Sequence, residues 1–528
     1  MEPATGDANM APGTVLLSEA RTNAIILHPQ PTDDPNDPLN WSALRKGVNF
    51  GIVCFYTLFT FVELDISSVA YYELVEDIGF TYQLSTIATA VNYAALAAGS
   101  VLFLPLVYRY GRRPIYLVSL VLQFAAMIWS AKLETNGEIV AVNVISGLGG
   151  AINETIVQIT IADMFFVHQY ATMNGIFLFM QTAGAYLGPV AAGYVVVSQG
   201  WRWMWWWCTI FIGISLVVVL FLFEESTYMP VLSGQASSEP STEQVANKQF
   251  NKEAGDEAAG LDRMVSRPPL NTAIPQHPLR QRLALITRTE APLWHHLYQP
   301  VIILFRFPAV MYAALTYGSV LAWFSVLISI ASTQMGYPPY NFGSVGIGLL
   351  NIAPFVGSLL GSILISPLSD WMIVRLARRN GGIYEPEMRL WPAIPGAFLV
   401  SGGVLMFGIG IAHTAPWPLL AVGFGIYGFG FVVCVDIALS YLTDSYQDII
   451  GDAMVGVIFV RNAVSVVVLF CLEPWSTNMG FQNMFILIAV MGFVILMIPV
   501  PLLIWGKKAR ISNADMHRWY AMRQRAQR

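Results

Sequence analysis

Charged residues are scarce in this chain of 528 residues, because Asp, Glu, Lys and Arg together make up only 12% of it. An ordinary soluble domain carries about twice that share. Hydrophobic residues make up 55%, the mean hydropathy is +0.56, and the apolar residues are gathered in long blocks. Such blocks with so few charges are typical of an α-helical protein that crosses the membrane many times.

Cysteine is rare as well, and all four cysteines lie inside apolar runs: Cys54, Cys208, Cys434 and Cys471. Their spacing indicates neither a disulfide framework nor a metal site. The Gly-x-x-x-x-Gly-Lys-Ser/Thr cradle of an ATP-driven pump is absent, and so is any catalytic triad. We therefore expect no cofactor, no metal and no enzymatic activity. The basic residues orient the chain in the membrane, and we expect no nucleic-acid partner.

Window hydropathy predicts twelve membrane-spanning segments in two sets of six. The runs from Leu84 to Val107 and from Ile115 to Ala131 carry no charged residue, and such runs cross a hydrocarbon core about 30 Å thick. The predicted spans are 47–69, 84–107, 114–131, 139–162, 172–198 and 202–223, then 301–331, 342–366, 391–412, 416–441, 450–472 and 482–505. The predicted fold is all-α and integral to the membrane, with two six-helix halves.

Polar segments precede, divide and follow these halves. Residues 1–46 are predicted to be a disordered cytoplasmic N-terminus without a cleaved signal peptide, and residues 224–300 a cytoplasmic linker rich in Ser, Pro, Gln, Glu and Asn. The first half then covers 47–223 and the second 301–505, and residues 506–528 form a basic cytoplasmic tail. Two six-helix halves predict a substrate site between them, near the midplane of the membrane.

The distribution of basic residues predicts the orientation. Links on one side carry Arg109, Arg112, Arg113, Arg375, Arg378, Arg379 and Arg389, whereas the first link on the other side holds Glu73, Glu76 and Asp77 without a basic residue. Because basic loops stay on the cytoplasmic side, both termini are expected in the cytoplasm. We expect a monomer in the plasma membrane, with the vacuolar or another internal membrane left open.

Charged residues inside apolar spans are costly, so each is a candidate for function. Glu154 in the fourth span is the first candidate, since a buried carboxylate accepts a proton or a cationic substrate. Its neighbour Asn153 and the acidic residues of the first span, Glu63 and Asp65, are further candidates. For each of them, a hydrogen bond that only packs the helices remains the alternative. Protons and a small molecule are the partners expected here, beside the lipid bilayer.

Two further charges lie in the second half, Asp436 in the tenth span and Arg461 in the eleventh. Because these spans are consecutive, we expect the two residues to form an ion pair with a structural or gating role. Deeper aromatic residues are expected to line a cavity for bulky apolar or cationic molecules. They are Tyr93, Tyr186, Tyr317, Trp323 and Tyr427.

Several motifs resemble the major facilitator superfamily, and within it the fungal twelve-helix drug:proton antiporters. They are Asp37-Pro38-Leu39-Asn40-Trp41, the turn Tyr110-Gly111-Arg112-Arg113-Pro114, the fifth-span stretch with Gly184, Gly188, Pro189 and Gly193, and Glu225-Ser226-Thr227. A second turn, from Asp370 to Arg379, matches the first one in position. The resemblance covers about Pro38 to Trp505 and implies that Arg109, Arg112, Arg113 and Asp370 belong to conformational motifs and that Pro189 bends a helix at the interface between the halves. Where the family's usual turn has an acidic residue, this chain has Tyr108.

Gly147 to Glu154 is similar to a stretch of fungal polyamine and organic-cation carriers. The sequence is therefore compatible with three functions. The first is proton-coupled export of a small amphipathic compound, such as a secondary metabolite, a toxin or a drug, by alternating access. The second is proton-coupled uptake of an organic cation such as a polyamine, and the third is a membrane sensor without transport. The short tail after Trp505 argues against the sensor, and the sequence favours export.

Overall fold

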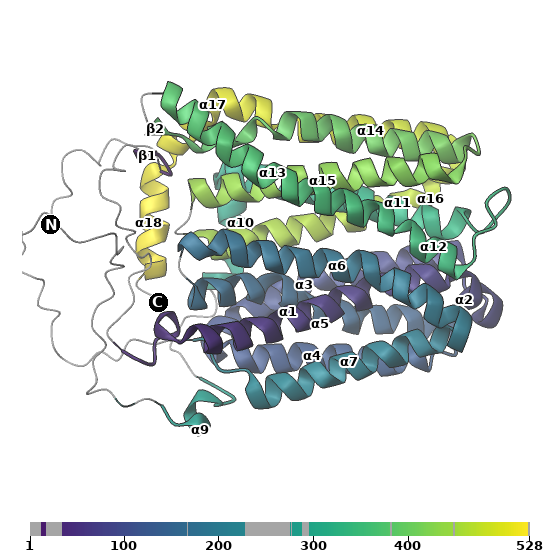
Figure 1. Cartoon of the computed structure of the whole chain (residues 1–528), viewed down its shortest axis with the longest axis horizontal. Coiled ribbons are helices and arrows are strands. Elements are labelled where there is room, and N and C mark those ends of the chain that lie inside the picture. The colour runs from purple at the N-terminus through teal and green to yellow at the C-terminus, as the bar shows by residue number, and fades with distance from the viewer. Residues whose placement is uncertain are drawn as a thin grey trace, which may run out of the picture.

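The structure is a computed structural model, and it describes residues 12–16, 34–165, 167–227, 275, 277–287, 295–380, 383–446 and 449–525. Long helices lie side by side in two groups, which are seen in the lower and upper parts of Figure 1. The first group holds α1 (Ala43–Asp65), α3 (Tyr82–Tyr110), α4 (Arg112–Ala131), α5 (Asn136–Met164), α6 (Val167–Gln199) and α7 (Trp201–Leu222). The second holds α11 (Pro308–Gln334), α12 (Ser344–Leu350), α13 (Ile352–Arg379), α14 (Ala393–Ala412), α15 (Trp417–Ser445) and α16 (Ile450–Leu496).

Shorter elements connect and flank these helices. They are β1 (Val15–Leu16), η3 (Pro38–Asn40), η4 (Ile66–Ala70), α2 (Tyr71–Ile78), α9 (Leu279–Arg282), α10 (His295–Arg306), β2 (Ile383–Tyr384), η5 (Pro386–Leu390), α17 (Pro499–Ser512) and α18 (Ala514–Arg525). Most of the long helices begin and end within a few residues of the predicted spans. However, α13 continues to Arg379 although its predicted span ends at residue 366, and α11 begins at Pro308 although its predicted span begins at residue 301. Local chemistry explains several ends, since Thr81 caps α3 by accepting the Leu84 N–H at 3.2 Å and Gly111 ends α3 at a φ of 96°.

The chain crosses the membrane twelve times although the described residues contain eleven candidate spanning stretches. The last stretch runs from Ile450 to Ser512 and is 63 residues long, enough for two crossings. Within it, α16 breaks at Gly480, which has a φ of 72° and a ψ of 162°. The two arms of α16 pack separately, the first with Arg461 against α11 and the second with Phe493 against Phe398 of α14, at 4.9 Å between ring centroids. The all-α fold with two six-helix halves is therefore confirmed.

Each half has its own apolar core, and both halves turn apolar side chains outwards. Leu102, Val121, Phe221, Val467 and Val494 are all more than half exposed on the outer faces of their helices. Such a surface is suited to contact with lipid tails, because the helical backbone satisfies its own hydrogen bonds. This arrangement agrees with a multi-pass membrane protein.

One end of the bundle, called the basic end below, carries Arg109, Arg112, Arg113, Arg389 and Arg510. The N-terminal strand β1 lies there, antiparallel to β2 of the second half. Arg510 of α17 forms a buried ion pair with Glu387, at 2.5 Å, and donates to the Pro12 carbonyl. α18 runs across the same end (Figure 1). Both described ends of the chain therefore lie at the basic end.

The predicted disordered N-terminus extends too far, because residues 34–46 have defined structure. Trp41 is buried, Lys46 Nζ donates to the Leu39 carbonyl at 3.0 Å, and α1 begins at Ala43. The predicted linker also contains α9 and the start of α10. The other parts of the predicted N-terminus and linker, residues 1–11, 17–33, 228–274, 276 and 288–294, lie outside the described residues, as do 526–528 of the tail.

Candidate functional site

A buried ion pair joins the two halves in the middle of the bundle. Glu154 of α5 pairs with Arg461 of α16, and their side chains are only 6% and 2% exposed. Burying two charges is costly, and in the low-dielectric interior the pair is stable only as long as both charges are present. The contact therefore makes the charge state of Glu154 matter for how the halves are held together.

The predicted partner of Arg461 is wrong. The sequence placed Asp436 beside Arg461 because their spans are consecutive, but Arg461 forms its ion pair across the interface, with Glu154. Asp436 lies half-buried on α15. The reason is geometric: the face of α16 that carries Arg461 is turned towards the first half, where the sequence offers another carboxylate.

Neutral groups complete the surroundings of the pair. Asn462 accepts from Arg461 Nη2 at 3.1 Å and donates to Glu154 Oε2 at 3.5 Å. The Arg461 guanidinium carbon lies 4.8 Å from the ring centroid of Tyr317 on α11, a cation–π distance. Asn153 accepts from Thr57 at 3.3 Å, while its Nδ2 is buried without a partner. The site thus has a buried amide N–H donor without a partner, on the residue next to Glu154.

Two of the predicted aromatic residues lie at the interface between the halves. The Tyr93 hydroxyl of α3 is 2.9 Å from Ser325 Oγ of α11, and the Tyr186 ring of α6 is 5.3 Å from that of Phe324. Trp323 and Tyr427 pack inside the second half. Trp323 packs against α16 at Gly492, and the Tyr427 hydroxyl donates to the Val320 carbonyl, so both belong to the core of the second half.

Glu63 and Asp65 lie near the end of α1 that faces away from the basic end. Glu63 is 3% exposed, and its Oε1 accepts from Ser146 of α5 at 2.8 Å, whereas Oε2 is buried without a partner. Asp65 is half-buried, and its carbonyl accepts from Ser68 at 2.8 Å. The structure therefore places Glu63 inside the first half and apart from the Glu154–Arg461 pair.

The glycines of α6 are sites of close helix approach. A Cβ on Gly184 would lie 2.4 Å from the Leu58 carbonyl of α1, and one on Gly188 would lie 3.1 Å from Val62. A Cβ on Gly193 would lie 2.7 Å from the Ser344 carbonyl of α12, in the second half. Pro189 stands inside α6, and its carbonyl is 2.7 Å from the position of a Cβ on Gly348. These residues let α6 touch both α1 and α12.

The basic turn is held by one carboxylate of α5 and one from the residues that follow α7. Glu225 accepts the backbone N–H groups of Arg112 and Arg113, each at 3.0 Å, and so caps α4. Arg112 Nε also lies 3.0 Å from Asp163. A Cβ on Gly111 would lie 2.6 Å from Glu225, which explains the glycine.

The remaining residues of the conformational motifs differ in their surroundings. Arg109 is exposed, 5.8 Å from the ring of Tyr110. Asp370 lies on α13, but its side chain lies outside the described part of the structure. Tyr108, which replaces an acidic residue of the family's turn, lies against Gly451 of the second half and 5.7 Å from Arg112.

Contacts at the end opposite the basic end were missed by sequence reasoning. Tyr72 of α2 donates to the Thr333 carbonyl at 2.8 Å and accepts the Gly336 N–H at 2.9 Å, while Ser344 donates to Glu73. These contacts join the first half to α11 and α12. Nothing in the local sequence signals them, because α2 looks like an ordinary polar link after the first span.

Replacing Tyr72 by phenylalanine should open this end more often. The change removes one hydroxyl that serves two hydrogen bonds between the halves, worth about 1 kcal/mol each, so we expect the population with this end open to rise about 30-fold. The measurement is the maleimide labelling rate of Cys introduced at Ser325, in a background with Cys471→Ser. Tyr194→Phe on α6, an exposed tyrosine, is the control. Equal labelling rates in the two variants would contradict the assignment.

Comparison with known proteins agrees with this architecture. The sequence profile of the Major Facilitator Superfamily matches residues 53–470. An MFS-type transporter of Schizosaccharomyces pombe is 30% identical over 98% of this chain and 95% of its own length. Protein HOL1 of Saccharomyces cerevisiae is 27% identical over 97% and 94%, and the efflux pump radE of Floropilus chiversii is 25% identical over 90% and 83%.

A solved structure shows the same fold at low identity. The peptide transporter POT in complex with sulfate has a TM-score of 0.59 and 16% identity, and the match covers 88% of this chain and 95% of that chain. The profile match spans most of the chain, and the relatives match it nearly from end to end. The protein therefore belongs to the major facilitator superfamily, as a transporter of small molecules.

Proposed function

We propose that this protein exports a small amphipathic compound in exchange for protons, by alternating access between the two halves. The observation that carries the proposal is the buried Glu154–Arg461 pair, which has one partner in each half. We place the protein in the plasma membrane as a monomer, with its basic end in the cytoplasm, because basic loops are retained there.

The ion pair provides a physical route for coupling. Separating the halves at the depth of α5 and α16 pulls Glu154 away from Arg461 and leaves two buried charges, which is strongly unfavourable. A proton on Glu154 removes the negative charge and with it most of the attraction. Proton binding then lowers the cost of separation, so the proton gradient can drive the change in access.

The surroundings of the pair suit an amphipathic substrate. Tyr93, Tyr186 and Tyr317 approach the interface from three helices, and aromatic rings bind apolar and cationic groups alike. Export is the direction we propose because a relative that matches most of the chain is named an efflux pump.

Uptake of an organic cation is the second candidate. It is favoured by Glu63, a buried carboxylate with one oxygen that has no partner, and by Asp65 close by in sequence. A cation needs such an acceptor when it leaves water. Export and uptake differ in the sign of the change in cell content, so one experiment separates them.

The test is the cell content of a fluorescent hydrophobic dye and of labelled spermidine, in yeast that lacks its own major pumps. We expect the protein to lower dye content and a protonophore to restore it. Glu154→Gln should lower proton-driven export by about tenfold or more, so that dye content no longer falls. Coupling free energies of 1–3 kcal/mol correspond to effects of about 5–150-fold. Glu134→Gln is the matched control, because Glu134 is exposed just before the start of the same helix.

Two outcomes would contradict the export proposal. Raised spermidine content that depends on Glu154 would favour the second candidate. Dye export that survives both the protonophore and Glu154→Gln would show that the pair does not couple transport to protons. Surface expression of each variant is measured in the same cells, so that loss of protein is not mistaken for loss of transport.

A further inference from the structure

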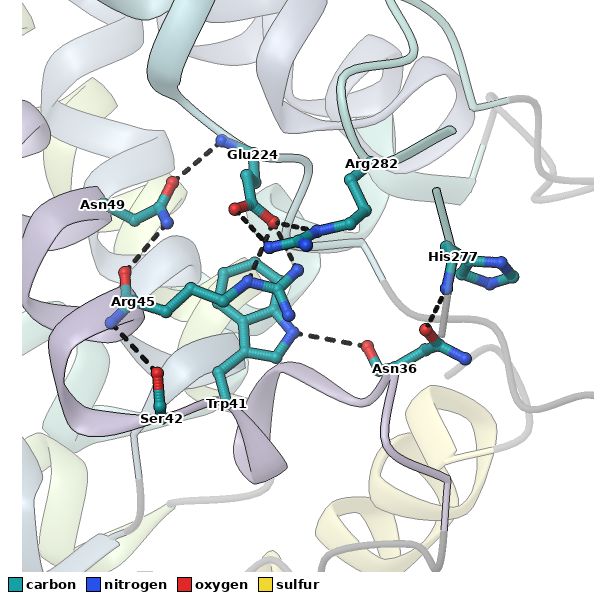
Figure 2. Close-up of polar contacts among 8 residues, drawn as sticks. All are labelled: Asn36, Trp41, Ser42, Arg45, Asn49, Glu224, His277 and Arg282. Atoms are coloured by element: carbon teal, nitrogen blue, oxygen red, sulfur yellow. Dashed lines mark hydrogen bonds and ion pairs between the residues drawn. The ribbon is translucent and has the colours of Figure 1, made fainter. Parts of the chain in front are cut away.

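A segment of the linker between the halves returns to the first half and binds there. This return segment comprises residues 277–287 and includes α9. Arg282 donates to the Glu224 carboxylate from Nε at 2.8 Å and from Nη2 at 2.7 Å. Arg45 at the start of α1 donates to the same carboxylate from Nε at 2.8 Å. Figure 2 shows both guanidinium groups converging on Glu224.

Backbone contacts fix the return segment along its length. The Thr287 N–H donates to the Tyr110 carbonyl at the end of α3, at 3.1 Å, and the Glu225 N–H donates to the Arg282 carbonyl at 3.3 Å. Arg113 of α4 donates to the Leu283 carbonyl. The segment therefore contacts the basic ends of α1, α3 and α4 and the residues that follow α7.

Further contacts of Glu224, Arg45 and the return segment extend the same site. The Glu224 N–H donates to Asn49 Oδ1 at 2.8 Å, and the Arg45 guanidinium carbon lies 3.8 Å from the centre of the Trp41 ring. Asn36 accepts the His277 N–H at 2.8 Å, as Figure 2 shows. Arg45, Glu224 and Arg282 are only partly exposed, so the cluster is built into the first half and is more than a surface ion pair.

This placement changes which part of the linker connects the halves. Glu224 follows α7, and Arg282 returns to it 58 residues later in the chain. With the return segment bound up to Thr287, which donates to the Tyr110 carbonyl, eight peptide bonds connect it to His295, where α10 begins. Eight peptide steps reach at most about 29 Å. With the segment released, the connection would begin at residue 228 and would be several times longer.

We propose that residues 277–287 are a latch that shortens the tether between the halves and so limits how far the basic end opens. Arg282 is the positioning residue, and Glu224 is its acceptor. Release of the latch lengthens the tether and allows a wider opening of the basic end. The proposal concerns the tether alone and holds whatever the substrate or the driving ion.

Limited trypsin digestion of the full-length protein in detergent tests whether the segment is bound. The readout is the rate of cleavage after Arg280. We expect Glu224→Gln and Arg282→Ala each to raise this rate by about tenfold, because each removes charge-assisted hydrogen bonds. Gln281→Ala should leave the rate unchanged, since Gln281 is exposed on the same turn. An unchanged rate in both latch variants would overturn the proposal.

Distances between spin labels test the effect on the tether. One label is placed at Arg109 of α3 and one at Arg379 of α13, both exposed at the basic end, in a background with Cys471→Ser. We expect the distance distribution to extend to longer values with Arg282→Ala and to stay unchanged with Gln281→Ala. Faster cleavage without longer distances would overturn the latch as a limit on opening. Neither readout depends on transport, so failure here differs from failure of the proposed function.

Discussion

Arg461→Met should destabilise the protein and abolish transport, whereas adding Glu154→Gln should restore stability and leave transport lost. The single change leaves the Glu154 carboxylate buried without its cation, which costs about 3–5 kcal/mol. The double change removes both charges and leaves neutral groups of similar size, and such replacements of buried pairs are often neutral for stability. Transport stays lost because no group remains that couples a proton to separation of the halves.

The measurement for this cycle is the thermal unfolding midpoint in detergent, together with substrate transport in cells. Lys508→Met is the control for loss of a positive charge, because Lys508 is exposed on α17. A double variant as unstable as Arg461→Met would mean that the pair does not explain the stability effect. A double variant that transports normally would exclude the pair from the mechanism.

Gly193→Val should have the second large effect, a loss of transport of about tenfold or more with both halves still folded. A Cβ at this position would lie 2.7 Å from the Ser344 carbonyl of α12, which is backbone of the other half. Backbone cannot move aside as a flexible side chain does, so overpacking of about 1–3 kcal/mol acts on the contact between the halves. The equilibrium then shifts towards states in which α6 and α12 are apart.

Gly175→Val is the matched control on the same helix, because a Cβ at Gly175 meets nothing within 4 Å. Both variants carry the same cost of a β-branched residue in a helix, so the difference between them isolates the contact. The measurements are transport and the labelling rate of Cys at Ser325. Equal transport in the two variants would show that transport does not require close contact between α6 and α12.

The fold could be predicted from the sequence because its signals are local. Apolar runs such as Leu84 to Val107 indicate where helices cross the membrane, since each crossing of the bilayer requires about 20 apolar residues. Gly111 and the arginines beside it marked a turn, and the structure places a turn there, with Gly111 at positive φ. Even the break at Gly480 falls between the two last predicted spans.

The candidate site could be predicted only in part. A buried carboxylate such as Glu154 stands out in a span of apolar residues, because charge is costly there. Trp323 and Tyr427 were chosen as deep aromatic residues, yet both pack within the second half. Hydropathy alone does not tell which face of an apolar helix meets the other half and which meets its own core.

By itself, the sequence determined that this protein is a membrane bundle of twelve spans in two halves and which charged residues lie inside them. Only the tertiary structure decided that Arg461 pairs with Glu154 and not with Asp436, that Tyr72 reaches α11, and that Arg282 returns to Glu224. The physical reason is that hydropathy and turn chemistry act over neighbouring residues, whereas partners across an interface are chosen by how the helices pack and rotate.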